Sequence, residues 1–168
     1  MSLKGQHIEP IAPTTPEYLR HQAIFGAYKL AKLYKITYEP IGAHALDSFN
    51  AFPSIYYHGP GHCGCLFTRG YEIDSNKINA SEWCGNAGCA TQGILNHGHL
   101  MDRGPRGHYF SPNWTTAQGY AYGKSDMQKL LPVFLVKAQR TWHTGHDIYL
   151  VRADIDILPC YLAVLRFP

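Results

Sequence analysis

The sequence predicts an α+β domain in which helices flank a mainly antiparallel sheet. Short runs rich in aromatic and branched aliphatic residues recur at 54–58, 130–136, 148–151 and 161–167, which is typical of strands. The helical patterns between them are few and do not alternate regularly with the strands, so a parallel sheet of βαβ units is disfavoured. A chain of 168 residues is long enough for one domain with its own core.

Composition narrows the class of protein. Apolar residues make up 45% of the chain and charged residues only 16%, which with 16 glycines and 11 prolines indicates a globular domain rich in turns. The formal charge of +3 is spread along the chain, and the closest basic cluster, Lys29, Lys32 and Lys35, fits a solvated helix face. Nucleic acid is therefore not indicated as a ligand. No apolar run approaches the length of a membrane span, so no membrane partner is expected.

The cysteines favour a reducing environment. There are five, an odd number without a regular framework, which predicts an intracellular protein of the cytoplasm or nucleus. Cys63, Cys65, Cys84 and Cys89 form two close pairs that could bind zinc, with nearby histidines as substitute ligands. The spacing of the first pair is tighter than zinc sites usually show, so reduced thiols are the simpler expectation and no metal site is predicted. Cys160 is expected to be a core thiol.

In the first third of the chain, residues 1–14 are predicted to be an extended, poorly ordered lead-in, and the domain is expected over 15–168. A helix should begin at Thr15, whose hydroxyl can cap it, with Pro16 and Glu17 in its first turn. An apolar stripe at helical spacing then predicts that this helix reaches Tyr34. Residues 37–53 are interpreted as a connector.

The remaining elements follow from local signals. The aromatic strand at 54–58 is ended by Gly59 and Pro60, and an irregular insertion is expected over 60–93. A short helix over 93–100 closed by Gly98, a strand around Tyr109 and a helix over 115–122 come next. After the strand at 130–136, we expect a turn at 141–145, a strand at 148–151, a break at 158–160 and a closing strand at 161–167.

Two aromatic stretches carry candidate binding residues. His58 offers an imidazole to a hydroxyl group, and Gly59, which has no side chain, lets the backbone meet an amide edge directly. Tyr109 and Tyr120 are eleven residues apart across a strand-to-helix turn, so their rings could flank a flat heterocycle. Core packing is the alternative explanation for each of these side chains.

Taken in order, these stretches resemble the NAD-binding segments of the poly(ADP-ribose) polymerase-like, diphtheria-toxin-type ADP-ribosyltransferases. The resemblance is carried by His58-Gly59, by Gly-x-Tyr-Phe-Ser at 107–111, by Tyr120 and by Leu-Pro-x-Tyr-Leu at 158–162. It covers about 54–167. It implies an ADP-ribosyltransferase-like fold with a split, mainly antiparallel sheet, and NAD as co-substrate.

The resemblance also implies roles for individual residues. His58 would hold the ribose 2′-hydroxyl, Gly59 would hold the nicotinamide amide, and Tyr109 and Tyr120 would sandwich the nicotinamide ring. Ala117 stands where the family has a serine that donates to the carboxamide, with Thr116 beside it. Pro60 stands where the family usually has threonine.

The third catalytic position of the family is normally a glutamate. Counting back from the motif at 158–162 places Ile148 there, so the catalytic set would be His58, Tyr109 and Ile148. Asp147 is adjacent, but strand side chains alternate faces, so only a bulge at Gly145-His146 would turn it toward the cleft. A glutamate stabilises the oxocarbenium-like sugar and orients a hydroxyl for chain growth, and isoleucine does neither.

The predicted function is therefore an NAD-dependent mono-ADP-ribosyltransferase. It would cleave the nicotinamide–ribose bond and transfer ADP-ribose to an acceptor protein. A catalytically silent domain of the same fold that binds a protein or nucleotide is the alternative, and a different fold with the aromatic segments in its core is a third. A Cys-His-Asp hydrolase is not supported, because nothing marks a positioned nucleophile.

Overall fold

The computed structural model describes residues 7–26, 28–37, 55–60, 90–97, 107–121, 130–153 and 156–166. Its main element is a five-stranded sheet in which all neighbouring strands are antiparallel. The strand order is β1-β2-β8-β5-β3. These strands are β1 (His7–Pro10), β2 (Leu30–Thr37), β8 (Ile157–Arg166), β5 (Leu130–Ala138) and β3 (Ile55–His58). The prediction of a mainly antiparallel sheet is confirmed.

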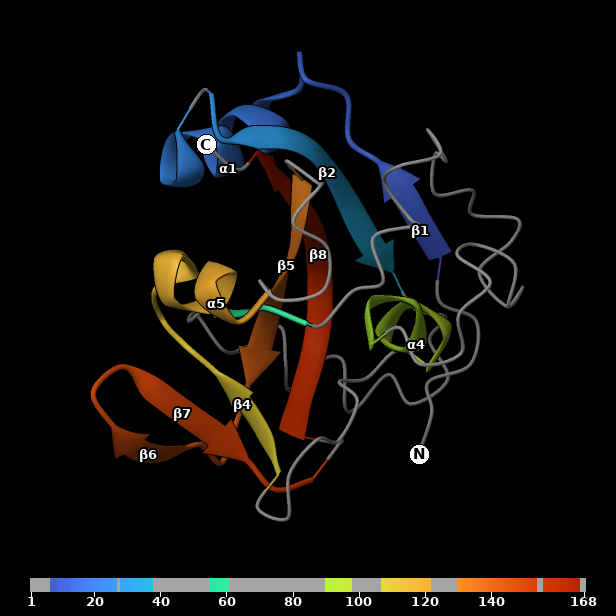
Figure 1. Ribbon diagram of the computed structural model, residues 1–168. Coiled ribbons are helices and arrows are strands. Elements are labelled where there is room, and N and C mark those ends of the chain that lie inside the picture. The colour runs from blue at the N-terminus through green and yellow to red at the C-terminus, as the bar shows by residue number, and fades with distance from the viewer. Residues whose placement is uncertain are drawn as a thin grey trace.

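The central strands β5 and β8 are covered on both faces. Val133, Phe134, Leu135 and Val136 are all fully buried, so β5 has a continuous apolar run where a half-exposed strand would alternate. Alternate side chains of this run enter two separate core clusters, one on each face of the sheet. Figure 1 shows β5 and β8 crossing the middle of the molecule, with helices to either side.

A second sheet and three helices supply the covering layers. The sheet has three strands in the order β4-β7-β6, namely β4 (His108–Phe110), β7 (Ile148–Val151) and β6 (Trp142–Gly145). Phe110 and Val151 enter one core cluster together with Ile94 and Leu95 of α4 (Ala90–His97). The other cluster receives side chains from α1 (Pro16–Phe25) and α5 (Trp114–Ala121). No helix among the described residues is both long and apolar enough to cross a membrane.

The predicted start of α1 is confirmed, and its predicted end is wrong. Thr15 caps the helix by accepting a hydrogen bond from the backbone N–H of Tyr18. The helix ends at Phe25 because Gly26 takes a φ of 98° and closes it through its own N–H to Gln22. The chain then enters β2, where pairing with β1 and β8 on both sides outweighs the helical pattern.

Three further expectations are corrected. The lead-in contributes β1, whose Ile8 is fully buried, although residues 1–6 lie outside the described part. Residues 142–145 form β6 and are not a turn. The chain does not break at 158–160, because β8 runs through Pro159. The pairing of β8 with β2 begins only at Tyr161, so Pro159 lies outside the stretch that pairs with β2. Cys160 is the extra residue of a bulge there, because Leu135 pairs with Tyr161 and Val136 with Pro159.

The other predicted elements are found within a few residues of their expected bounds. These are β3, β4, α5, β5 and β7. The helix expected over 93–100 begins earlier, at Ala90, and its described part ends at His97, so the predicted Gly98 cap lies outside the described residues. Thr37, the first residue of the expected connector, ends β2, and residues 38–53 of that connector lie outside the described residues, as does most of the insertion expected over 60–93.

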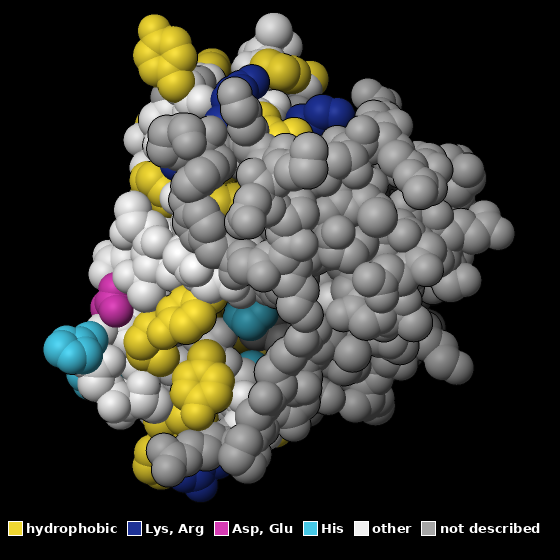
Figure 2. Space-filling model, viewed as in Figure 1, with side chains coloured by type: hydrophobic (Ala, Val, Ile, Leu, Met, Phe, Trp, Pro, Cys, Tyr) yellow, Lys and Arg dark blue, Asp and Glu magenta, His cyan; other side chains and the backbone are white. Residues whose placement is uncertain are grey.

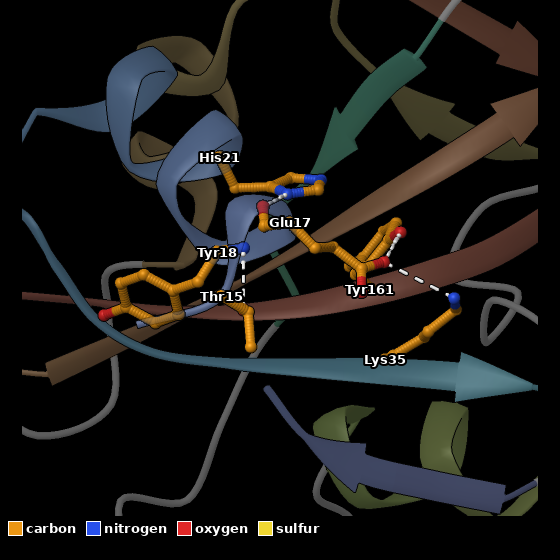
Figure 3. A network of polar contacts seen from close by, with 6 residues as sticks. All are labelled: Thr15, Glu17, Tyr18, His21, Lys35 and Tyr161. Atoms are coloured by element: carbon orange, nitrogen blue, oxygen red, sulfur yellow. Dashed lines mark hydrogen bonds and ion pairs between the residues drawn. The ribbon is translucent and has the colours of Figure 1, made fainter. Parts of the chain in front are cut away.

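Polar contacts fasten α1 to the large sheet. The hydroxyl of Tyr161 on β8 donates to Glu17 Oε1 at 2.5 Å, and Lys35 Nζ on β2 lies 3.4 Å from the same oxygen. The ring of His21 packs against Tyr161 with 4.4 Å between ring centroids (Figure 3). The hydrogen bond from Tyr161, followed by Lys35, lowers the pKa of Glu17, whereas burial and then Glu17 raise the pKa of Tyr161. The group therefore joins one helix to two strands.

Glu17→Gln should lower the free energy of unfolding by about 1 kcal/mol at neutral pH, because it weakens this hydrogen bond and removes the charge facing Lys35. Since the folded-state pKa of Glu17 is depressed, its contribution is present above the ordinary value of 4.5 and is lost as the pH falls through the folded value. Urea unfolding at pH 7 and at about pH 3.5 should show the difference between wild type and variant shrinking. A difference of equal size at both pH values would contradict this account.

Candidate functional site

The two predicted binding stretches meet at the junction of the two sheets. Tyr57 N–H donates to Ser111 O at 2.7 Å, and Ser111 N–H donates to Tyr57 O at 2.9 Å. This antiparallel bridge joins β3, an edge strand of the large sheet, to the residue that follows β4. As a result, His58 Nδ1 lies 2.7 Å from the carbonyl oxygen of Tyr109, 51 residues away in the sequence. The sequence prediction that these stretches act together is supported by this contact.

The contact defines the chemistry of His58. A carbonyl oxygen can only accept a hydrogen bond, so Nδ1 of His58 carries the proton and donates to Tyr109. In the neutral ring Nε2 then has a lone pair, which can accept a hydrogen bond from a hydroxyl group. The ring is partly exposed at the end of β3. The backbone of β4 thus fixes the orientation of the His58 ring.

Gly59 is required by the approach of α5. A Cβ atom at this position would lie 1.7 Å from the carbonyl oxygen of Ala117 and 3.0 Å from the backbone nitrogen of Ala121. No side chain fits there, because both contacts are with backbone atoms of a helix. Glycine is required at position 107 for a similar reason: its φ is 128°, and a Cβ would lie 2.1 Å from the carbonyl oxygen of Val151 on β7. Packing of the chain on itself therefore explains both glycines.

Tyr109 and Tyr120 are not core aromatics. Tyr120 on α5 is 65% exposed and Tyr109 on β4 is 38% exposed, whereas Tyr57 on β3 is buried. Tyr109 points away from the core because its neighbours His108 and Phe110 are the buried residues of β4. Figure 2 shows hydrophobic side chains gathered over α5, β4 and β7, next to a hollow where histidine side chains are visible. Both rings are available to a ligand, and core packing does not explain them.

Ala117 lies on the inner side of α5. Its side chain is buried and belongs to the core cluster beneath that helix. The hydroxyl of Thr116 donates to Asp147 Oδ2. The hydrogen bond that the family's serine makes therefore has no counterpart in the Ala117 side chain, and the proton of Thr116 is already used.

Ile148 and Asp147 take different directions. Ile148 is half-buried and shares a face of the small sheet with Leu150, which pairs directly with Tyr109. Asp147 belongs to the two-residue turn between β6 and β7, and its Oδ2 accepts hydrogen bonds from Thr116 and, at 2.8 Å, from Asn113 Nδ2. The irregularity in β6 lies between His143 and Gly145, before the predicted bulge position. Asp147 is therefore held at the start of α5.

Sequence reasoning missed the partners of Asp147. Asn113 directly precedes α5 and its backbone N–H donates to Ser111 Oγ at 3.1 Å, a local pattern that indicates a helix start. That pattern gives no sign of a partner 34 residues later. The hydrogen bond from Asn113, followed by that from Thr116, lowers the pKa of Asp147, so this carboxylate is ionised at neutral pH.

The four cysteines considered as zinc ligands, Cys63, Cys65, Cys84 and Cys89, all lie outside the described residues. Within the described ranges, no three histidine, cysteine or acidic side chains lie close enough together to hold a metal ion. Burial raises the pKa of the Cys160 thiol to about 11, which makes it unreactive at neutral pH.

Comparison with known proteins adds no relative. No protein-family model matches the sequence, and no curated protein is significantly similar to it. The functional argument therefore depends on the site itself. Its positive elements are a histidine whose ring is oriented by the backbone of β4, and the exposed side chains of Tyr109 on β4 and Tyr120 on α5.

Gly59→Ala should destabilise the fold by about 1–3 kcal/mol, because the added methyl group overlaps the backbone of α5. Gly119→Ala is the matched control: Gly119 lies on α5 itself, where an added Cβ meets nothing within 4 Å, so the variant should raise stability by roughly 0.5–1 kcal/mol. Chemical denaturation of both variants measures the two effects. Equal stability of the two variants would show that the approach of α5 to Gly59 is looser than described.

Proposed function

We propose that this chain is an NAD-dependent mono-ADP-ribosyltransferase. The observation that carries the proposal is the hydrogen bond from His58 Nδ1 to the Tyr109 carbonyl, which unites the two stretches that resemble the family. It is supported by the exposure of Tyr109 and Tyr120, since neither ring has a place in the core. The mainly antiparallel sheet is compatible with an ADP-ribosyltransferase-like fold.

In this proposal the protein binds NAD at the nicotinamide end. Nε2 of His58 accepts a hydrogen bond from a ribose hydroxyl, and the backbone at Gly59 contacts the carboxamide. Tyr109 and Tyr120 stack on the nicotinamide, where each ring contributes on the order of 1 kcal/mol. These contacts fix the ribose and its leaving group relative to each other, which lowers the entropic part of the barrier.

The chemical step breaks one C–N bond and forms one bond to the acceptor. Nicotinamide leaves with the electron pair of the glycosidic bond, and the ribose passes through an oxocarbenium-like state. A nucleophilic group of the acceptor protein then attacks this carbon and gives up its proton to solvent. Ile148 offers neither charge nor hydrogen bond to a second ADP-ribose hydroxyl, so transfer stops after one unit. A cytoplasmic or nuclear location fits this use of NAD.

A silent domain of the same fold is the second candidate. It is favoured by one observation: the carboxylate nearest to position 148 belongs to Asp147, which is bound to α5. The strands β4, β6 and β7 themselves carry no acidic residue. Such a domain would bind NAD or a protein partner without cleaving the nicotinamide bond.

Titration calorimetry with a non-hydrolysable NAD analogue, beside a labelling assay with NAD, tests the proposal. We expect wild type to bind and to attach single ADP-ribose units, with Tyr109→Ala weakening binding about fivefold through loss of one stacking ring. Tyr28→Ala, which removes a tyrosine that is 92% exposed, serves as control and should bind as wild type does.

The outcomes separate the candidates. Binding without labelling supports the silent domain. Absence of binding by wild type contradicts both NAD-dependent readings. Equal loss of affinity in Tyr109→Ala and Tyr28→Ala would remove the role given to Tyr109.

A further inference from the structure

Two polar residues at the start of α5 donate hydrogen bonds to a carboxylate from the small sheet. Asn113 Nδ2 donates to Asp147 Oδ2 at 2.8 Å, and the hydroxyl of Thr116 donates to the same oxygen. Asp147 comes from the turn between β6 and β7, so these contacts join that turn to the start of α5.

The position suits a negative charge. The first turn of α5 presents unpaired backbone N–H groups, and the positive end of the helix dipole favours a carboxylate beside it. The turn that carries Asp147 also adopts a constrained conformation. Gly145 has a φ of 131° and His146 has a φ of 50°. Residues other than glycine seldom adopt positive φ values. Contacts made by Asp147 help to hold this turn in place.

Both elements joined by Asp147 carry residues of the proposed NAD site. The segment from β4 into α5 carries Tyr109 and Tyr120, and the hairpin of β6 and β7 carries Ile148 directly after Asp147. We propose that Asp147 is a positioning residue of this site, which fastens the hairpin to the start of α5 and so fixes Ile148 relative to the tyrosines. This inference rests on the proposed function for its consequence in ligand binding.

The proposal differs from a catalytic role for Asp147. A catalytic carboxylate has to be ionised at the reacting sugar, so Asp147→Asn would abolish its effect as fully as Asp147→Ala. A positioning role needs an acceptor for Thr116 and Asn113, and the amide oxygen of Asp147→Asn can still accept. Partial rescue by asparagine is therefore the property that separates the two roles.

Hydrogen exchange of the ligand-free protein tests the fastening directly. In Asp147→Ala and in Thr116→Val, backbone amides of residues 142–151 should exchange roughly two- to fivefold faster, since exposed polar contacts of this kind are weak individually. The double variant should show no further increase over Asp147→Ala, because Asp147→Ala alone already removes the contact with Thr116. Thr116→Ser and Asp147→Asn should lie closer to wild type. Glu9→Ala, which removes an exposed carboxylate from β1, is the control and should leave the hairpin unchanged.

The NAD analogue supplies the second readout. Asp147→Ala should weaken its binding by the same roughly two- to fivefold factor, and Asp147→Asn should restore part of the affinity. Unchanged exchange in Asp147→Ala would overturn the fastening, and faster exchange with unchanged affinity would overturn its role in the site. If wild type does not bind the analogue, the proposed function and the positioning role fail together, and the exchange data still decide whether Asp147 fastens the hairpin.

Discussion

Two backbone hydrogen bonds between Tyr57 and Ser111 join the two sheets of this molecule. They continue the edge of the large sheet into the segment that leaves the small one, so the end of β3 comes to lie against both β4 and α5. The contact of His58 with Tyr109 and the contact of Gly59 with Ala117 follow from this junction. Both bonds are between backbone atoms, while the side chains of Tyr57 and Ser111 are buried, so the junction is held by main-chain pairing and by packing.

Local signals in the sequence predict a strand or helix correctly where residues that break secondary structure mark both of its ends. The strands β3, β5 and β7 and the helix α5 were predicted because aromatic or aliphatic runs are bounded there by glycine, proline or polar residues. The signals failed where two periodicities overlapped. Residues 30–37 continue an apolar stripe of helical spacing, yet pairing with two neighbouring strands makes them β2. Proline at 159 predicts a break, yet β8 continues through it, because the residues of β8 that pair with β2 are Tyr161 to Leu165 and Pro159 lies outside them.

The sequence predicts which residues could form the candidate site, but it predicts few of the contacts that these residues make. The order of His58, Gly59, Tyr109 and Tyr120 along the chain was sufficient to propose a common cleft. The sequence could not reveal that Ala117 faces the core or that Asp147 is held by Asn113, because both depend on how α5 rotates and packs. The positive φ of His146 could not be predicted either, because a glycine is the usual sequence signal for such a turn and none occupies that position.

The glycines and the tyrosines of the two motifs would be conserved in homologues for different reasons. Gly59 and Gly107 are both enforced by the close approach of other backbone segments, whatever ligand is present. A homologue without the proposed NAD site would still retain them, because selection for folding alone would remove substitutions at these positions. Tyr109 and Tyr120 have exposed rings, so their loss would carry little cost to the fold. In any set of homologues, persistence of the tyrosines is therefore the diagnostic trace of an active site, and persistence of the glycines is not.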